Sequence, residues 1–294
     1  MPSWLEGKAN TAKVRSVGPN VDEDGNSTRI VWELNGGSHF QYVYSDGTEF
    51  VLDREGTEIW ARWPDTLTLA DTATYFLGPI LGFLLRLRGF ISLHASAIVV
   101  KDSGIALLGP ARAGKSTAAA TFADLGYPVV SDDVLAIIDN GDHFLIQPAY
   151  PRIRLWPESV NALYGTADHL PRLTPTWDKR YLDLTDKGYR FQPEVITLAG
   201  VFLLGERRED NRAPYIEKMS AAEKMMSLVG NSYASYMLDK QMRSKEFEVF
   251  NRLVATVPVQ RIIPHRKIER LPRLCQLIVE DSAESRHAAL VTDD

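Results

Sequence analysis

The N-terminal part of the chain alternates apolar and polar residues. The alternation runs from Arg29 to Arg62 and is clearest in the segment Phe40–Tyr44. Three turn signals, rich in glycine and polar residues, interrupt it at residues 35–37, 45–47 and 54–56. A period of two is typical of strands with one buried face, and such turns join neighbouring strands. The pattern predicts a small antiparallel β meander, followed by a helix from about Asp71 to Arg88.

Two apolar runs follow this predicted helix. Ile91–Val100 and Ile105–Leu108 are separated by Lys101–Gly104, which has the length of a hairpin turn. We expect the two runs to pair antiparallel, with Val100 opposite Ile105. A tight turn at this point argues against a crossover helix between the two strands.

The rest of the chain mixes strand and helix candidates. The Ala-rich stretch Gly114–Leu125 predicts a helix, and a short strand is expected at Pro128–Val130. Further strands are predicted at Val134–Ile138, Phe144–Gln147, Arg152–Trp156, Tyr181–Leu184 and Ile196–Leu204. Further helices are predicted at Ser220–Ser235, Lys245–Val257 and Leu271–Asp281, and a solvated loop at Gly205–Arg212.

Composition and charge narrow the class of protein. The chain has 294 residues, of which 45% are hydrophobic and 24% are charged, as in soluble globular proteins, and we divide it into domains at 1–89 and 90–294. A net charge of −5 favours neither a nucleic-acid partner nor an anionic membrane surface. The single Cys275 and the lack of a secretory signal in Met1–Arg15 indicate the cytoplasm. The apolar stretch Thr72–Leu85 is shorter than the roughly 20 residues of a membrane span, so we expect a buried helix there.

The segment Gly109–Ser116 fits the phosphate-loop pattern G-x-x-x-x-G-K-[ST]. An apolar strand leads into it and a helix leaves it, as the motif requires. Glycines let the backbone curl so that its N–H groups face an anion, and the helix N-terminus adds a positive dipole end. Lys115 is expected to reach the phosphate oxygens and Ser116 to coordinate magnesium. The candidate nucleotide-binding residues are Gly109, Ala111, Arg112, Ala113, Gly114, Lys115, Ser116 and Thr117.

Two adjacent carboxylates follow the next predicted strand. Asp132 and Asp133 lie 16 and 17 residues after Ser116, where a parallel neighbouring strand would bring both to the phosphate edge. One could hold magnesium while the other accepts a proton. Adjacent strand residues point to opposite faces, so the sequence leaves open which one faces the substrate, and a solvent-facing acidic turn is the structural alternative.

Other polar residues are candidates on weaker grounds. With Val100 opposite Ile105, His94 falls across from Ala111 inside the loop, although a buried structural histidine explains it equally well. Arg154, Lys179 and Arg180 form a downstream basic set that could clamp phosphates or simply be surface charges.

The segments Leu93–Ser96, Gly109–Ser116 and Ser131–Asp133, at these spacings, resemble the catalytic domain of the HPr kinase/phosphorylase family. The resemblance is strongest over residues 91–140. It implies an α/β fold of the phosphoenolpyruvate-carboxykinase-like kind, with a phosphate loop on a mixed sheet, beside the small N-terminal antiparallel β-rich domain. ATP and Mg²⁺ are the implied cofactors.

The resemblance also implies roles for single residues. Lys115 and Ser116 would hold the ATP phosphates and magnesium, and Asp132 would deprotonate an acceptor serine. Asp133 would support metal or phosphate, and His94 would assist at the transferring phosphoryl group. The chain departs from the family where Arg152 replaces the glutamate of a Glu-Ile-Arg signature, and Glu158 is the nearest acidic candidate to replace it.

These features predict an ATP- and Mg²⁺-dependent kinase that phosphorylates a serine of a peptide or protein, such as the precursor of a peptide natural product. A kinase of free serine and a non-catalytic nucleotide-sensing module are the alternatives. A homo-oligomer is compatible with the family. The acceptor, the oligomeric state and any reverse reaction are left open by the sequence.

Overall fold

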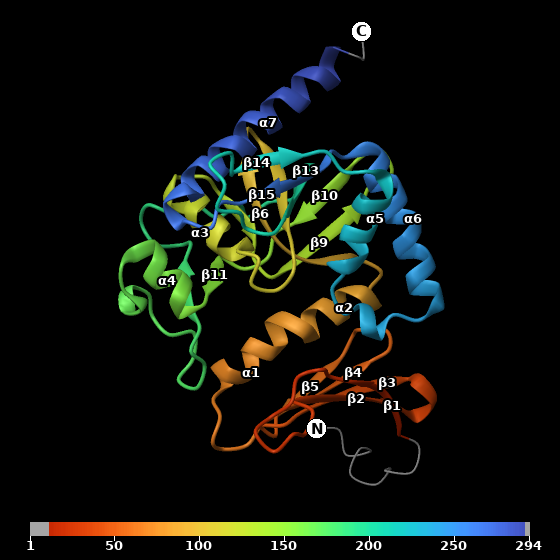
Figure 1. Ribbon diagram of the computed structural model, residues 1–294. Coiled ribbons are helices and arrows are strands. Elements are labelled where there is room, and N and C mark those ends of the chain that lie inside the picture. Colours follow the sequence, from red (N-terminus) through yellow and green to blue (C-terminus); the bar gives the residue numbers. More distant parts are fainter. Residues whose placement is uncertain (1–11, 292–294) are drawn as a thin grey trace. The chain divides into compact units, whose positions relative to one another are not determined.

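The computed structural model describes residues 12–291, which form two compact units (Figure 1). The smaller unit holds the described residues up to Phe90, together with Thr174–Thr176 and Ala234–Met242. The larger unit begins at Ile91 and holds the remainder. The first residues of the expected signal-free N-terminus lie outside the described residues.

The smaller unit is built on a five-stranded antiparallel meander, which confirms the predicted alternation. Its strands, in spatial order, are β1 (Lys13–Val17), β2 (Arg29–Leu34), β3 (His39–Tyr44), β4 (Glu49–Asp53) and β5 (Ile59–Arg62). Alternate residues of β3 are buried, so one face of the sheet forms a core.

The helix predicted from Asp71 to Arg88 is interrupted. Helix α1 (Leu69–Tyr75) starts with a capping box between Thr68 and Asp71. A π turn (Phe76–Ile80) follows and contains Pro79, which has no N–H to continue the helical bonding, and then comes α2 (Leu81–Leu87). Phe83 is fully buried and packs edge-on against Phe40 with ring centroids 5.1 Å apart, so the meander core includes this helix.

The larger unit contains a mixed eight-stranded sheet. The strand order is β10-β9-β6-β7-β13-β15-β14, with β8 also paired to β6 and β10 also to β13. Strands β7, β13 and β15 run parallel and the other pairs run antiparallel. The strands are β6 (Ile91–Val100), β7 (Ser103–Leu108), β8 (Val129–Ser131), β9 (Val134–Asp139), β10 (Phe144–Gln147), β13 (Ile196–Leu204), β14 (Tyr215–Glu217) and β15 (Val259–Ile263). A separate pair consists of β11 (Arg152–Leu155) and β12 (Arg180–Asp183).

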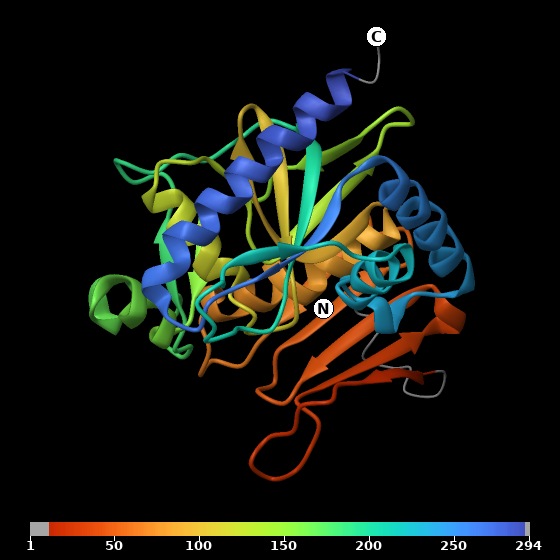
Figure 2. The same ribbon diagram turned by 45° about the horizontal axis from the view of Figure 1, so that its top comes forward.

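Helices cover both faces of this sheet (Figures 1 and 2). On one face Leu228 and Phe250, from α5 (Ala221–Gly230) and α6 (Lys240–Thr256), pack with alternate residues of β6 and β7. On the other face Phe122 and Leu274, from α3 (Lys115–Asp124) and α7 (Leu271–Val291), do the same. The short helix α4 (Pro157–Tyr164) follows β11. The architecture is therefore α/β, with the sheet as the middle layer.

The hairpin register differs from the prediction. Strands β6 and β7 pair antiparallel as expected, but Val100 lies opposite Ser103 rather than Ile105. The turn is the two-residue loop Lys101–Asp102, in which both residues have positive φ angles of 46° and 63°, and such loops match the twist of the strands. The shift of two residues preserves which face each side chain points to.

The strand before the two aspartates has a different neighbour from the predicted one. Strand β8 pairs antiparallel with β6, so β6 separates it from β7. Because β6 also runs antiparallel to β7, strands β7 and β8 point the same way, and their carboxyl ends reach one edge of the sheet. Asp132 and Asp133 therefore still lie at the sheet edge where β7 ends, although the predicted pairing of their strand is wrong.

Several helix and strand boundaries also differ from the predictions. Helix α5 stops at Gly230, five residues before the predicted end, because the next residues bond to β6, with the Tyr233 N–H donating to the Ser92 carbonyl. Helix α7 continues beyond Asp281 to Val291, and α4, β14 and β15 were not predicted. Within residues 12–291, none of the helices combines the length and apolar composition that a membrane crossing requires.

Candidate active site

The loop between β7 and α3 curls around the start of the helix. Gly109 and Gly114 have φ angles of 152° and 106°, and Arg112 adds a third positive value of 66°. A Cβ on Gly114 would lie 2.9 Å from Nη2 of Arg207, and one on Gly109 would lie 3.0 Å from the Cβ of Ala113. Among residues 12–291, no side chain caps the N-terminus of α3. Because the first N–H groups of a helix have no intrahelical acceptor, this end is suited to an anion.

Lys115 lies within this loop. The residue is 6% exposed, and its Nζ donates to the carbonyl oxygens of Gly109 at 2.7 Å and Pro110 at 3.1 Å. Burial, and to a smaller degree the charge of Lys179, lower the pKa of Lys115 to about 8, although Asp132 and Asp133 act in the opposite direction. A phosphate placed at the loop would stabilise the protonated amine.

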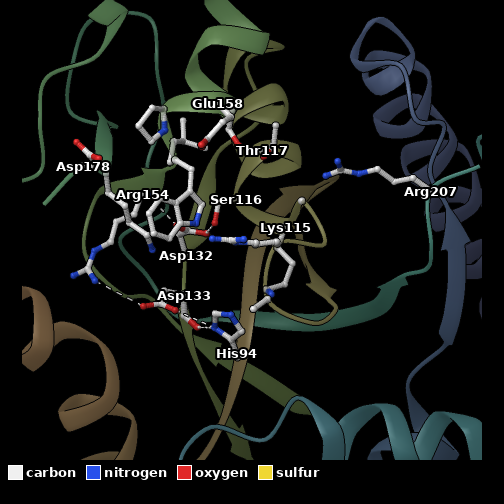
Figure 3. Close-up of a pocket in the computed structure, with 18 residues that line it drawn as sticks. His94, Lys115, Ser116, Thr117, Asp132, Asp133, Arg154, Glu158, Asp178 and Arg207 are labelled. Carbon is white, nitrogen blue, oxygen red and sulfur yellow. Dashed lines mark hydrogen bonds and ion pairs between the residues drawn. The ribbon is translucent and has the colours of Figure 1, made fainter. Parts of the chain in front are cut away.

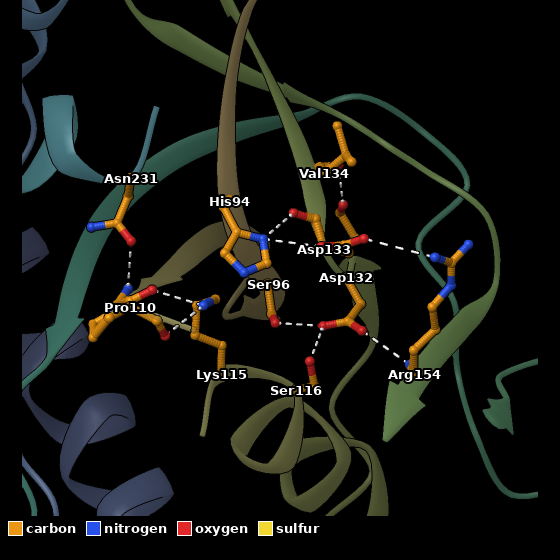
Figure 4. Close-up of polar contacts among 12 residues, drawn as sticks. His94, Ser96, Pro110, Lys115, Ser116, Asp132, Asp133, Val134, Arg154 and Asn231 are labelled. Atoms are coloured by element: carbon orange, nitrogen blue, oxygen red, sulfur yellow. Dashed lines mark hydrogen bonds and ion pairs between the residues drawn. The ribbon is translucent and has the colours of Figure 1, made fainter. Parts of the chain in front are cut away.

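Asp132 is the centre of a buried hydrogen-bond network (Figure 4). It is 2% exposed, and its Oδ1 accepts the hydroxyls of Ser96 at 2.6 Å and Ser116 at 2.8 Å. Its Oδ2 accepts the backbone N–H of Arg154 at 3.0 Å. The carboxylate thus fixes the hydroxyl of Ser116, the side chain expected to bind magnesium.

Asp133 faces the other way and pairs with His94. Its backbone has a positive φ of 76°, which turns the residue away from the line of the strand. Nδ1 of His94 lies 3.0 Å from Oδ1 of Asp133 and 3.1 Å from the Asp133 carbonyl oxygen, and Nη1 of Arg154 lies 3.8 Å from Oδ2. Burial alone would raise the pKa of Asp133, but His94, Arg154 and Lys179 together hold this pKa below its ordinary value.

The contact with Asp133 fixes the proton on His94. Both oxygens near Nδ1 can only accept, so Nδ1 is the donor and carries a proton in either charge state. In the neutral ring Nε2 then has a free lone pair. Figure 4 shows this second ring nitrogen turned toward the side of Pro110 and Lys115.

These groups surround a cavity of about 630 Å³ (Figure 3). Of the residues predicted from the sequence, it is lined by His94, Ala111, Arg112, Gly114, Lys115, Ser116, Thr117, Asp132, Asp133, Arg154 and Lys179. Glu158, on the first turn of α4, also lines it. The structure therefore brings residues from β6, the loop, the end of β8, β11 and the 178–179 segment to one space.

Three predicted site residues lie elsewhere. Gly109 and Ala113 form the base of the loop: the Gly109 N–H donates to Asn231 and the Ala113 N–H to the Pro110 carbonyl. Arg180 does not line the cavity, so its predicted place in the clamp is wrong. Arg180 is 5% exposed, and its guanidinium donates to the carbonyls of Ala167 and Asp178. Arg180 therefore supports the segment that follows α4, and this structural role was not predicted from the sequence.

Two residues at the loop were missed by the sequence reasoning. The side-chain Oδ1 of Asn231 accepts the backbone N–H of Gly109 at 3.2 Å, and the backbone carbonyl of Asn231 accepts the backbone N–H of His94 at 2.8 Å. Arg207 approaches the loop with Nη2 3.4 Å from the Ala113 carbonyl. Arg207 lies in the charged segment predicted to be a solvated loop, and Asn231 lies 122 residues from Gly109, so no local signal marks either residue.

The donor set is compatible with magnesium carried by a nucleotide. Mg²⁺ is usually held by one or two protein oxygens, with phosphates and water completing its shell. Within the described part of the chain, no three His, Cys, Asp or Glu side chains gather into a metal site. The Ser116 hydroxyl, oriented by Asp132 beside the loop, matches this sparse mode of binding. Asp133 lines the same cavity but bonds to His94 instead.

Comparison with known proteins gives little beyond this geometry. No protein-family model and no curated protein matches the chain. Among solved structures it is similar to the Hpr(Ser) kinase/phosphatase from Coxiella burnetii, with 12% identity and a TM-score of 0.39. The match covers 69% of this chain and 96% of that one. Similarity at this level identifies neither a family nor a function for the chain.

Proposed function

We propose that this protein is an ATP- and Mg²⁺-dependent kinase that transfers the γ-phosphoryl group to a serine hydroxyl of a peptide or protein. One observation carries the proposal. A Gly-rich loop at a helix N-terminus, its lysine, a carboxylate-bound serine and an Asp–His pair all line one cavity. These are the parts that phosphoryl transfer requires for positioning and charge neutralisation.

The loop and α3 hold the triphosphate in this proposal. Backbone N–H groups at the start of α3 and the ammonium of Lys115 face the phosphate oxygens. Lys115 exchanges its carbonyl acceptors in the loop for the phosphates. Bound magnesium, with Ser116 as its protein ligand, would neutralise charge on the phosphates.

The two aspartates divide the work differently from the roles that the family resemblance implies. Asp132 is buried and already accepts three hydrogen bonds, one of them from Ser116. We therefore assign Asp132 to orienting the magnesium ligand. Asp133 is the carboxylate beside His94 in the cavity, and we assign this pair to the acceptor hydroxyl. The lowered pKa keeps Asp133 ionised at neutral pH, so it mainly orients the hydroxyl.

The transfer step forms one bond to phosphorus and breaks another. The acceptor hydroxyl oxygen forms a bond to the γ-phosphorus, and the bond from that phosphorus to the bridging oxygen breaks with its electron pair leaving on ADP. The hydroxyl proton passes to the Asp133–His94 pair and then to solvent. Arg154 and Lys179, which line the same cavity, offset the negative charge of the transferred group.

The proposal also covers the phosphoryl acceptor, the oligomeric state and the cellular compartment. A peptide or protein serine is the acceptor that the resemblance favours, and a homo-oligomer is compatible with it. Cytoplasmic ATP and a reduced Cys275 suit a cytoplasmic enzyme. Free serine is the second acceptor candidate, because Arg112, Lys179 and Glu158 line the cavity and could pair with its carboxylate and amine. A nucleotide sensor that binds ATP without transfer is the third reading.

Mass spectrometry of acceptors separates these functions. Purified protein is incubated with Mg²⁺, ATP and serine-bearing peptides encoded beside its gene, or with free serine, and an Asp133→Asn variant serves as control. A phosphoryl mass gain on one acceptor, absent with the variant, supports the kinase and names its substrate class. ATP binding with no transfer to any acceptor would favour the sensor.

A further inference from the structure

Strands β6 and β7 part at the start of the phosphate loop. The last pair between them is Ala95 opposite Leu108. The same register, continued by one residue, would place His94 opposite Gly109. Gly109 instead turns away with a φ of 152° and begins the loop. The backbone N–H groups of His94 and Gly109 therefore need acceptors from another part of the chain.

Asn231 supplies both acceptors. Its side-chain Oδ1 accepts the Gly109 N–H at 3.2 Å, and its backbone carbonyl accepts the His94 N–H at 2.8 Å. Nδ2 of the same amide donates to the Ser227 carbonyl at 2.8 Å. This bond fixes the amide, because a flipped amide would turn its NH₂ group toward the Gly109 N–H and its oxygen toward the Ser227 carbonyl.

The segment 231–233 is itself anchored in the larger unit. The N–H of Tyr233 donates to the Ser92 carbonyl of β6 at 2.8 Å. The hydroxyl of Ser232 donates to the carboxylate of Glu246 on α6. Ser232 and Glu246 are 8% and 5% exposed, so this bond is shielded from water. The segment is therefore fixed to both β6 and α6.

Asn231 connects the two sides of the proposed reaction. On the nucleotide side, the Gly109 carbonyl accepts Nζ of Lys115 at 2.7 Å. On the acceptor side, Nδ1 of His94 lies 3.0 Å from Oδ1 of Asp133. Figure 4 shows Asn231 and Asp133 on opposite sides of His94. A change in the side chain of Asn231 would thus alter the distance between the loop and the imidazole.

We propose that Asn231 is a positioning residue for phosphoryl transfer, which sets the distance between the phosphate loop and His94. The inference rests on the proposed function, since it presumes a triphosphate in the loop and an acceptor at the Asp133–His94 pair. Transfer requires the incoming and leaving oxygens to lie in line, and a misplacement of about 1 Å can slow such a step about 100-fold. The Gly109 N–H is bound to Asn231, so nucleotide binding depends on the N–H groups further along the loop.

Variants at position 231 separate this role from that of a purely structural cap. ADP formation is measured with free serine or with a serine-bearing peptide encoded beside the gene, whichever the wild type phosphorylates. Calorimetry gives the Kd for Mg·ATP. We expect Asn231→Ala and Asn231→Gln to lower kcat by roughly 10- to 100-fold and to leave this Kd within about threefold. Gln keeps the amide but is one methylene longer, whereas Asn231→Asp keeps the length and an acceptor oxygen and should largely retain kcat.

Ser220→Ala is the matched control. It removes the capping box with Glu223 at the other end of α5 and leaves Asn231 in place. Its kcat should stay within about twofold of the wild-type value. Circular dichroism at the assay temperature checks that each variant is folded. A wild-type kcat in Asn231→Ala and Asn231→Gln, or a rise in Kd as large as the fall in kcat, would overturn the proposal.

A double-mutant cycle tests whether Asn231 acts together with His94. If Asn231 sets the distance to the imidazole, Asn231→Ala should lower kcat by less than about threefold once His94→Ala has removed that ring. An equal loss in both backgrounds would mean that Asn231 acts on the loop alone, and would refute the positioning role.

Amide hydrogen exchange of the unmodified chain, followed by NMR, needs no substitution. We expect the N–H groups of both Gly109 and His94 to be protected without nucleotide, because one anchored residue accepts both. Exchange of the Gly109 N–H at the rate of a free amide would contradict the proposal, since a mobile side chain cannot set a distance.

The two proposals fail differently in these experiments. If the wild type phosphorylates an acceptor and the Asn231 variants keep its kcat, only the positioning role is wrong. If the wild type binds no Mg·ATP, or transfers phosphate to neither acceptor, the proposed function fails and the positioning role with it.

Discussion

Replacing Asp132 by Asn tests how the site divides its two carboxylates. In the wild type, Oδ1 of Asp132 accepts two hydroxyls and Oδ2 accepts a backbone N–H. The amide of Asn has only one acceptor oxygen. If that oxygen keeps the Arg154 N–H, the NH₂ group faces Ser96 and Ser116 and donates to their oxygens. The lone pair that Ser116 would offer to magnesium is then engaged.

The size of the effect follows from these contacts. A hydrogen bond to a charged acceptor contributes about 1.5–3 kcal/mol. Loss of the oriented Ser116 hydroxyl should therefore weaken Mg²⁺-dependent nucleotide binding by roughly 10- to 100-fold. Binding of ATP without Mg²⁺ depends on the loop amides and Lys115, so it should change little.

The assay is the ratio of the Kd for ATP without Mg²⁺ to the Kd with Mg²⁺, measured by calorimetry. We expect Asp132→Asn to bring this ratio close to one. Ser96→Ala is the matched control, because it removes the other hydroxyl on Oδ1 and leaves Ser116 in place. Asp133→Asn should keep the ratio but slow transfer, since it disturbs the contacts with His94 and Arg154 and leaves those of Ser116 in place.

The opposite pattern would refute this division. If Asp132→Asn keeps the full Mg²⁺ dependence while Asp133→Asn loses it, Asp133 supports the metal, as the family resemblance implies. Thermal unfolding of each variant separates these outcomes from loss of the folded state.

Three further changes probe the loop. The pKa of Lys115 is about 8, so above that pH the free amine must regain a proton when phosphate binds. We expect the Kd for Mg·ATP to rise by up to about tenfold per pH unit above 8, with proton uptake in calorimetry, and a constant Kd would contradict this. Gly114→Ala should destabilise the folded loop by about 1–3 kcal/mol, because alanine is strained at a φ of 106°, and should weaken ATP binding. Adding Arg207→Ala, which removes the nearest side chain, should not restore ATP binding, because the strain is in the backbone. Asn231→Ala leaves the buried N–H of Gly109 without its acceptor, and urea unfolding should record a loss of about 1–3 kcal/mol that Asn231→Asp largely avoids.

Local patterns in the sequence were sufficient for several elements. The alternation in residues 29–62 predicts the meander because burial of one sheet face imposes a period of two. The turn after Val100 predicts the antiparallel hairpin, since so few residues allow no crossover. The Gly109–Ser116 motif marks the start of α3, where the strand, the glycines and the lysine are contiguous in the chain.

The register and the partners of each polar group required the fold. A two-residue turn rather than a longer one set the pairing of Val100, and β6 came to lie between β7 and β8. Arg180 is basic like Arg154, but its bonds to carbonyls beyond α4 hold it away from the cavity. The pairing of β8 with β6 and the bond from Arg180 to the Ala167 carbonyl join residues 13 or more positions apart, which no local pattern relates.

The sequence by itself determined which chemical groups this protein brings to the loop before α3, because the glycines, the lysine and the serine stand in one short segment. Only the tertiary structure decided what the two aspartates do. Asp132 and Asp133 are adjacent and identical in type, yet one is buried under three donors and the other turns to His94 through a positive φ. Burial and hydrogen-bond partners, which give a carboxylate its role, come here from residues 16 to 39 positions away and are fixed only when the chain folds.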